Sequence, residues 1–363
     1  MIKSSYYQYT IFIGKLQEIV ANFLHNRDTE VNELFGIEIL GMGTYNPSLC
    51  ITNEDMAKVV ETNDEWITTR TGISSRNFSD GEPTWKMGAE AAKKAVEKAG
   101  IAPEEIGLII DATITNDFKT PSVACVIQRE IGAVNAAAFD LNAACSGFVY
   151  SVDVAKRFLQ TDENLKYVLV VANESLSKIL DYSDRSSCIL FGDGAAAAVI
   201  GKSDKLYTSH MGADGTGAHF LYAKHTDVKH PFRTKPSEMT EGEFGSEKNT
   251  LVQDGKEVYK FATKALPLAA TKAAEKENVD INSIDWFVPH QANIRIIETA
   301  AKNLGVSMDK FIVNIAAHGN TSSVSIPLAL TEAIESGKIK KGDRICLVGF
   351  GAGLTLGAII MDY

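Results

Sequence analysis

The sequence contains an internal repeat, and this repeat limits the possible folds more than any other feature. Residues 94–110 (KAVEKAGIAPEEIGLII) match residues 272–288 (KAAEKENVDINSIDWFV) at an offset of 178 positions. In each copy a helical pattern leads into a short apolar strand. A unit that occurs twice in one chain indicates a fold of two related halves. Because helices and strands alternate, the pattern predicts a mostly parallel sheet sandwiched by helices.

The repeat continues with a shorter offset. Ile131-Gly132 aligns with Leu304-Gly305 at an offset of 173 positions. The same offset aligns Asn142–Gly147 with Ile315–Asn320. We therefore expect these last two stretches to form turns at related places, where pseudo-symmetry brings them together.

Three segments follow from this division: an N-terminal extension (1–35) and two α/β halves (36–205 and 206–363). Within the extension, Tyr9–Leu24 is apolar in patches that Lys15, Gln17 and Glu18 interrupt. A signal peptide is the alternative, but no small-residue cleavage site follows. The pattern favours a short amphipathic helix.

Cys145 lies between a predicted strand (136–141) and a predicted helix whose apolar residues begin at Phe148 and Val149. A thiol at that place meets the unpaired N–H groups and positive end of the helix dipole, which stabilise a thiolate. Small neighbours leave room for a substrate. A packed core cysteine is the alternative, and the residues described below favour the reactive thiol.

Composition excludes several classes of protein. The net charge is −10 and no basic stripe offsets it, which argues against a nucleic-acid-binding protein. No long uncharged apolar run predicts a membrane span. The five cysteines are odd in number and form no CxxC pair, as is typical of reduced thiols in a cytoplasmic protein; they are Cys50, Cys125, Cys145, Cys188 and Cys346.

Two further patterns are weak. Gly41-Met-Gly43 follows a strand, as in dinucleotide-binding folds, but the third glycine is missing and Pro47 interrupts the expected helix. A loose series of histidines has spacing that matches no compact metal site, so we predict no metal; its members are His210, His219, His225 and His230.

Polar residues at turns of the second half are candidate partners of the thiol. His290 follows a predicted strand (286–288), at the carboxyl end where open α/β sheets place ligands. Asn320 lies in His318–Ser322, a turn of residues that tolerate unusual backbone angles. Taken alone, each residue is better explained by a structural role. A strand that runs into a glycine loop (345–357) can aim backbone N–H groups at an oxyanion, or simply form a hairpin.

Trp66 and Arg70 lie four residues apart on a predicted helix. An indole beside a guanidinium suits a nucleotide base and phosphate. A surface pair without a ligand is the alternative.

Taken together, ordered motifs between Gly36 and Tyr363 resemble β-ketoacyl-acyl-carrier-protein synthase III, within the thiolase superfamily. The motifs are WITTRTGI (66–73), NAACSGF (142–148), FGDGAAA (191–197), PHQANIRII (289–297), HGNTSSVSIPLAL (318–330) and GFGAG (349–353). The resemblance implies a thiolase-like fold of five layers, with two pseudo-symmetric halves whose mixed sheets sandwich helices. It also implies a homodimer.

The same resemblance implies roles for individual residues. Cys145, His290 and Asn320 would be catalytic, with the backbone N–H groups of Cys145 and Ala352 as the oxyanion hole. The other implied residues are Trp66, Arg70, Arg185 and Asn293 for coenzyme A; Thr120, Phe191 and Phe350 for the acyl pocket; and Lys256, Lys260, Arg295 and Lys302 for docking an acidic carrier protein. No cofactor is implied, because the coenzyme A thioester is a substrate.

The implied chemistry suits these residue types. Cys145 attacks an acyl-coenzyme A thioester, and the exchange between two thiols is nearly balanced. Decarboxylation of a malonyl group on acyl carrier protein then places negative charge on the thioester oxygen. His290 and Asn320 donate hydrogen bonds to that enolate without a metal.

Some features depart from the family pattern. Residues 1–35 precede the usual start, and Lys224–Asn249 is longer and more polar than expected. Ala352 stands where glycine is common. Thr120 stands where an aromatic residue often reaches the partner subunit's acyl pocket, so this pocket would be larger.

Two other functions stay open. A related condensing enzyme or acyltransferase of specialised metabolism would use the same acyl-cysteine. A non-catalytic acyl-binding subunit would keep only the fold, but the joint presence of Cys145, His290 and Asn320 argues against it.

Overall fold

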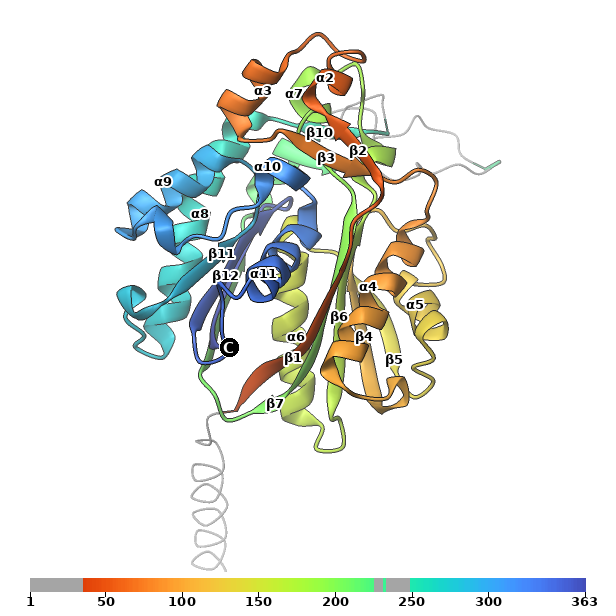
Figure 1. The fold of residues 1–363 in the computed structure, drawn as a ribbon, viewed down its shortest axis with the longest axis vertical. Helices are drawn as coiled ribbons and strands as arrows, with labels where there is room; N and C mark the ends of the chain where they lie inside the picture. The colour runs from red at the N-terminus through yellow and green to blue at the C-terminus, as the bar shows by residue number, and fades with distance from the viewer. Residues whose placement is uncertain (1–34, 225–230, 233–248) are drawn as a thin grey trace, which may run out of the picture. The chain divides into compact units, whose positions relative to one another are not determined.

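The computed structural model describes residues 35–224, 231–232 and 249–363, and Gly36–Tyr363 form one compact unit (Figure 1). The helix predicted in the N-terminal extension and most of the unusual 224–249 loop lie outside the described residues. Within the described ranges, no helix is both long and apolar enough to cross a membrane.

The first sheet has five strands in the order β1-β7-β6-β4-β5. β4 pairs in parallel with β5 and β6, whereas β7 runs antiparallel to both β6 and β1. The strands are β1 (Gly36–Tyr45), β4 (Ile106–Ala112), β5 (Ala137–Leu141), β6 (Tyr167–Glu174) and β7 (Gly194–Ser203).

The second sheet has the order β11-β12-β13-β8. Only β11 and β12 are parallel; the other two pairs are antiparallel. The strands are β8 (Tyr207–Ala213), β11 (Trp286–Pro289), β12 (Arg344–Gly351) and β13 (Thr355–Asp362). Both sheets are mixed, as the resemblance implied, so the expectation of mostly parallel pairing was wrong. Three residues (352–354) join β12 to β13, too few for the crossover that parallel strands require.

Helices and sheets alternate in five layers (Figure 1). Outer helices α4 (Thr84–Ala99) and α5 (Val123–Ile131) cover the first sheet, and α8 (Gly255–Lys276) and α9 (Ile294–Leu304) cover the second. Two central helices, α6 and α11, contact strands of both sheets; they span Gly147–Thr161 and Ser325–Glu335. The predicted five-layer fold is therefore confirmed.

Shorter elements surround these layers. Two small sheets pair β2 (Leu49–Thr52) with β3 (Ser75–Phe78) and β9 (Leu221–Ala223) with β10 (Leu251–Gln253). The short helices are α2 (Asn53–Met56), α3 (Asp64–Thr71), α7 (Arg185–Cys188) and α10 (Ile315–His318). The 3-10 turns are η1 (Pro103–Glu105), η2 (Ala144–Ser146), η3 (Leu176–Ile179), η4 (Gly215–Phe220), η7 (Ile281–Ser283), η8 (Met308–Lys310) and η9 (Ser322–Val324).

The glycines of β1 serve helix packing and not a dinucleotide. A side chain at Gly41 would lie 2.4 Å from the Ala95 carbonyl oxygen of α4, and one at Gly43 would lie 2.3 Å from that of Ala91. Without Cβ atoms, β1 can approach α4 closely. This contact accounts for the Gly-x-Gly pattern.

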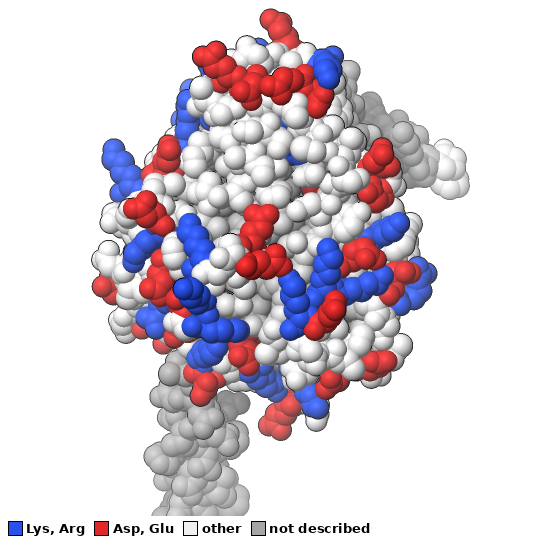
Figure 2. Space-filling view, viewed as in Figure 1, with Lys and Arg blue, Asp and Glu red and all other residues white. Residues whose placement is uncertain are grey.

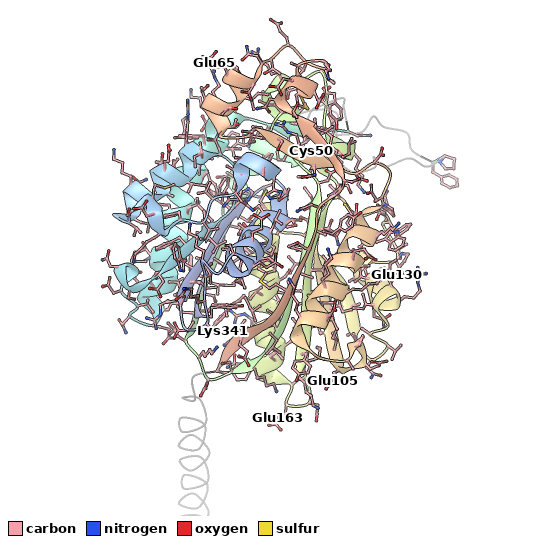
Figure 3. All side chains as sticks on the ribbon, in the orientation of Figure 1. Cys50, Glu65, Glu105, Glu130, Glu163 and Lys341 are labelled. Atoms are coloured by element: carbon pink, nitrogen blue, oxygen red, sulfur yellow. The ribbon has the colours of Figure 1, made fainter. Side chains whose placement is uncertain are left out.

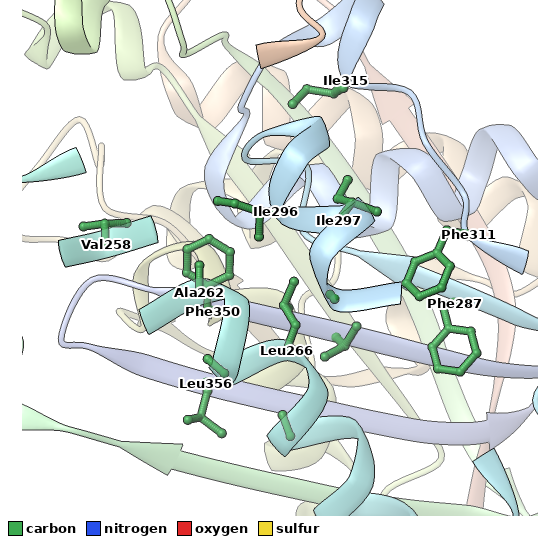
Figure 4. Close-up of a cluster of buried hydrophobic side chains, with 14 of the residues drawn as sticks. Val258, Ala262, Leu266, Phe287, Ile296, Ile297, Phe311, Ile315, Phe350 and Leu356 are labelled. Atoms are coloured by element: carbon green, nitrogen blue, oxygen red, sulfur yellow. The ribbon is translucent and has the colours of Figure 1, made fainter. Parts of the chain in front are cut away.

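The apolar residues of the second half bury α8 and α9 against their sheet. Figure 4 shows Val258, Ala262 and Leu266 of α8 in this cluster with Phe350 of β12. Phe287 and Phe311 stack with ring centroids 4.9 Å apart. The cluster fixes β12, whose end reaches the Cys145 turn.

The two halves repeat in a register that differs from the sequence alignment at one place. η2 precedes α6 as η9 precedes α11, at the original offset of 178 and not 173. Ala144 (φ 47°) then corresponds to Ser322 (φ 53°), and each N–H donates to an asparagine Oδ1 two residues before it, that of Asn142 or Asn320. The match of Asn142–Gly147 to Ile315–Asn320 was therefore wrong, because the second half carries the additional helix α10.

Candidate active site

One cavity of about 200 Å³ brings together most of the predicted site residues. Its lining includes the three candidate catalytic residues and residues of α3, α7 and the first turns of α8 and α9. The lining residues used below are Trp66, Arg70, Cys145, Phe191, His290, Asn293, Asn320, Phe350 and Gly351.

Cys145 lies in η2, the single turn that leads from β5 into α6. Ala144 before it has a φ of 47°, a costly conformation for a residue with a Cβ atom and one that is common at functional sites. The end of β12 passes directly against this turn: a side chain at Gly351 would lie 2.7 Å from the Cys145 nitrogen. The glycine loop therefore permits close approach to the backbone of Cys145.

The Cys145 thiol is buried, and burial raises its pKa to about 12. Ser322 lowers the pKa, and the charge of Glu174 raises it, but desolvation dominates. Desolvation therefore opposes the thiolate that the helix terminus was expected to stabilise.

We expect alkylation of Cys145 by iodoacetamide to accelerate about tenfold per pH unit between pH 6 and 9, because the thiolate is the nucleophile and its fraction rises tenfold per unit below the pKa. Peptide mass spectrometry after short exposures measures the rate. A plateau near pH 7 would show that the thiol pKa is not raised.

His290 directly follows β11, and its backbone N–H donates to the Val348 carbonyl of β12 at 2.8 Å. Its Nδ1 lies 2.7 Å from the Ser325 hydroxyl, and its ring meets Phe350 edge-on at 5.2 Å. Nε2 is buried and has no partner among the described residues. Burial lowers the pKa of His290 to about 3, so the imidazole is neutral at physiological pH.

Gln291 fixes the loop that carries His290. Its side chain amide donates to the carbonyls of Pro289 and Ile312, at 2.8 and 3.1 Å, and its oxygen accepts from Asn314 N–H. These three hydrogen bonds hold the loop in place, because breaking any one of them would leave a buried polar group unpaired.

Asn320 presents its amide N–H₂ and not its carbonyl. Its Oδ1 accepts from Ser322 N–H at 2.9 Å, which assigns Nδ2 to the other side of the group. Its backbone pairs with the strand segment at Phe191, through Asn320 N–H to Leu190 O (2.8 Å) and Gly192 N–H to Asn320 O (3.0 Å). The site therefore has amide donors at a fixed place beside Cys145.

Glu174, at the end of β6, was missed by the sequence analysis. Its carboxyl accepts from Thr115 Oγ1 (2.5 Å) and Ile114 N–H (3.2 Å), and lies 3.1 Å from Ser323 Oγ. Burial raises the pKa of Glu174 to about 7. Ser323 has one hydroxyl proton, which it can donate to the Ala112 carbonyl 2.9 Å away. A protonated Glu174 can then donate its own proton to Ser323 Oγ, so that both contacts of this hydroxyl are hydrogen bonds. Glu174 thus links the end of β4 to the turn after Asn320.

Trp66 lies against two guanidinium groups at the mouth of the cavity. Cζ of Arg70 is 4.5 Å, and that of Arg185 4.7 Å, from the indole centroid. Arg185 also donates to Glu61 O at 3.0 Å, and Asn293 donates to Arg70 O at 3.0 Å. All four residues predicted for coenzyme A therefore belong to one cluster.

Comparison with known proteins agrees with this geometry. The family model described as 3-Oxoacyl-[acyl-carrier-protein (ACP)] synthase III matches residues 139–215, and its C-terminal counterpart matches residues 274–363. The chain is 49% identical over 329 residues to the beta-ketoacyl-[acyl-carrier-protein] synthase III of Clostridium acetobutylicum, covering 90% of this chain and 98% of that protein. This chain belongs to the β-ketoacyl-acyl-carrier-protein synthase III family.

Solved structures give the same result. The 3-oxoacyl-[acyl-carrier-protein] synthase III of Aquifex aeolicus superposes with a TM-score of 0.82 at 39% identity, covering 90% of this chain and 100% of that chain. The priming beta-ketosynthase of the R1128 polyketide pathway gives 0.79 at 36%, covering 90% and 96%. The chain is thus an acyltransferase with the thiolase-like fold and the condensing activity that starts fatty-acid synthesis.

Apart from the docking residues, three predicted residues are not among those that line the cavity: Arg185, Thr120 and Ala352. Thr120 is exposed on the loop before α5, and Ala352 lies half-buried, one residue beyond Gly351. Phe191 and Phe350, the other residues predicted for the acyl pocket, do line the cavity. Lining the cavity does not by itself assign a role, so the roles of all the predicted site residues stay predictions.

The four basic residues predicted for docking lie on adjacent helices. Lys256 and Lys260 belong to α8, and Arg295 and Lys302 to α9. Lys260 pairs with Glu257 at 2.6 Å, and Arg295 donates to Thr69 O at 2.7 Å. Figure 2 shows acidic side chains gathered at the top of its face, where α2 and α3 lie, whereas basic and acidic side chains are mixed over the rest of that face.

The weaker signals do not join the site. His210 lies on β8 and His219 in η4, while His225 and His230 lie outside the described residues. Cys50 is exposed on β2 (Figure 3), Cys125 is exposed on α5, and the other three thiols are buried; all five are free.

Proposed function

We propose that the chain condenses an acyl-coenzyme A primer with malonyl-acyl carrier protein to give a 3-oxoacyl-acyl carrier protein. One observation carries this proposal: a thiol, a neutral imidazole with an unpartnered Nε2 and an amide with a fixed orientation line the same cavity. The mouth of that cavity holds the Trp66 cluster.

The first half-reaction transfers the acyl group to Cys145. The Cys145 sulfur bonds to the acyl carbon, the bond to the coenzyme A sulfur breaks, and the thiol proton ends on coenzyme A. The backbone N–H groups of Cys145 and Ala352 would meet the tetrahedral oxyanion.

The second half-reaction consumes a proton. The malonyl carboxylate leaves as carbon dioxide, and His290 and Asn320 stabilise the enolate oxygen. Its carbon attacks acyl-Cys145 and expels the thiolate. A thiol whose pKa burial raises to about 12 takes up a proton at neutral pH, which restores the resting enzyme.

Trp66, Arg70 and Arg185 suit the nucleotide end of coenzyme A, and Asn293 would lie near its pantetheine arm. Two guanidinium groups carry the charge that phosphates require, and the indole offers a stacking surface. The carrier protein would instead meet the basic side chains on α8 and α9.

Arg70→Ala and Trp66→Ala should raise KM for acyl-coenzyme A about 2- to 30-fold with little change in kcat, because each removes binding remote from the reacting carbon.

Arg295→Ala should raise KM for malonyl-acyl carrier protein but not for malonyl-coenzyme A. Added salt should weaken binding of the carrier protein more in the wild-type enzyme than in the variant. Equal losses on both malonyl substrates would contradict the docking role.

The edge of the first sheet favours a homodimer. Among the described residues β5 pairs with β4 alone, and its exposed side includes half-buried Phe139, whose ring lies 6.3 Å from that of exposed Phe158. Unpaired apolar edges are normally covered. A dimer through this edge would let Thr120 reach the partner's acyl pocket; sedimentation equilibrium would measure its mass.

Assays with a panel of acyl-coenzyme A primers test the function. We expect an intact-mass adduct on the enzyme and a 3-oxoacyl product only with malonyl-acyl carrier protein. The similarity to a polyketide-priming ketosynthase keeps a role in specialised metabolism as the second candidate. A product with another acceptor would favour that role, and absence of any adduct would favour a binding protein.

The free thiols agree with the cytoplasm as the location of this protein.

A further inference from the structure

The Ser325 hydroxyl lies between two nitrogen atoms of the loop after β11. Gln291 N–H donates to Ser325 Oγ at 3.3 Å, and His290 Nδ1 lies 2.7 Å from the same oxygen. Each of these three residues is only 1% exposed, so water does not compete for these contacts.

The hydroxyl has one proton to donate, and its use decides where the His290 proton lies. In the described part of the chain, the one acceptor in contact with this hydroxyl is His290 Nδ1. If Nδ1 carried the proton instead, Ser325 would accept two N–H groups and its own O–H would be buried without an acceptor, which is unfavourable.

We propose that Ser325 is a positioning residue that holds neutral His290 in the tautomer with its proton on Nε2. The inference rests on the proposed function, in which Nε2–H donates to the enolate oxygen. A ring nitrogen's protonation follows from the hydrogen bond that the other nitrogen makes.

Other contacts support this assignment. In the part of the chain that the structure describes, Nε2 is buried and has no partner, as expected of a donor reserved for a substrate. The low pKa of His290, about 3, keeps the ring neutral, so the tautomer is the variable that matters. Ser325 is the first residue of α11, and Phe350 against the ring limits its rotation.

Nitrogen-15 NMR of histidine-labelled, substrate-free enzyme tests the assignment directly. The His290→Ala spectrum identifies the His290 signals among the seven histidines. We expect wild-type Nε2 to be protonated and Nδ1 to be unprotonated, and Ser325→Ala to shift the population toward Nδ1–H. A proton on wild-type Nδ1, or an unchanged tautomer in Ser325→Ala, would overturn the proposal.

Kinetics separate positioning from folding. Ser325→Ala should slow release of carbon dioxide from malonyl-acyl carrier protein about 10- to 100-fold, the range for outer partners of site histidines, while Ser325→Thr, which keeps the hydroxyl, should restore both rate and tautomer. Thr331→Val removes another buried hydroxyl of α11, one that bonds Pro327 O, and should change neither. Equal losses in Thr331→Val and Ser325→Ala would make the effect structural.

The two proposals fail in different ways. If wild-type enzyme released no carbon dioxide from malonyl-acyl carrier protein, the proposed function would be wrong, and the tautomer would still be read from the substrate-free spectrum. If it released carbon dioxide with its proton on Nδ1, only the role of Ser325 would be wrong.

Discussion

Cys145→Ser should lower the rate of acyl transfer from acyl-coenzyme A by on the order of 10⁴- to 10⁶-fold, as removal of a covalent nucleophile does. The serine hydroxyl is far less acidic than a thiol, and no described base contacts this side chain to activate it. Intact-mass spectrometry after incubation with acyl-coenzyme A measures the adduct, and peptide mapping of wild-type enzyme should place it on Cys145.

Cys188→Ala is the matched control. Cys188 is also fully buried, and burial raises its pKa to about 11, but it does not line the cavity. Loss of this thiol should therefore leave acylation close to the wild-type rate. An adduct mapped to Cys188, or to exposed Cys50, would show that the assignment of Cys145 as the nucleophile is wrong.

Local pattern was sufficient to predict the elements that present the site. Helices ending at Gly100 and Gly132 stop there because each glycine adopts a left-handed conformation, with φ of 67° and 77°. Cys145, His290 and Asn320 each follow a strand or turn that the sequence marks, and the repeat suggested that two of these turns are related. Ordered motifs then supplied the roles that no single residue reveals.

What the sequence could not supply depends on contacts between distant segments. Glu174 reads as the last residue of a strand until Ser323, 149 positions away, is seen beside it. Ser325 reads as one of several serines in HGNTSSVS, and only the 2.7 Å contact to His290 distinguishes it. The raised pKa of the Cys145 thiol could not be read from the sequence for the same reason, because desolvation is a property of the packed core and the helix dipole is a local one.

The repeat also explains why Asn320 and Cys145 differ in function although their turns match. Both turns hold an asparagine Oδ1 with an N–H two residues later, and both have a left-handed residue at that position. In the first half the following residue is the cavity thiol, Cys145. In the second half it is Ser323, which contacts Glu174, and the asparagine itself lines the cavity.

Asn320→Asp should reduce release of carbon dioxide from malonyl-acyl carrier protein by about 10²–10³-fold, the cost of losing one donor to a developing oxyanion. Aspartate keeps the Oδ1 acceptor for Ser322 N–H, so the turn should persist while the N–H₂ donor is lost. Labelled carbon dioxide from carboxyl-labelled malonyl-acyl carrier protein measures the step, and adduct mass measures acylation of Cys145 separately.

Acylation should change much less than decarboxylation, because the acyl oxyanion is assigned to backbone N–H groups and the enolate to the two side chains. Asn320→Ala should behave like Asn320→Asp, whereas Asn320→His, which restores an N–H donor, should recover part of the rate. Loss of acylation with normal decarboxylation in Asn320→Asp would reverse the assigned roles. Equal loss of both, with a lower melting temperature, would show that Asn320 acts mainly through the turn that its Oδ1 holds by accepting from Ser322 N–H.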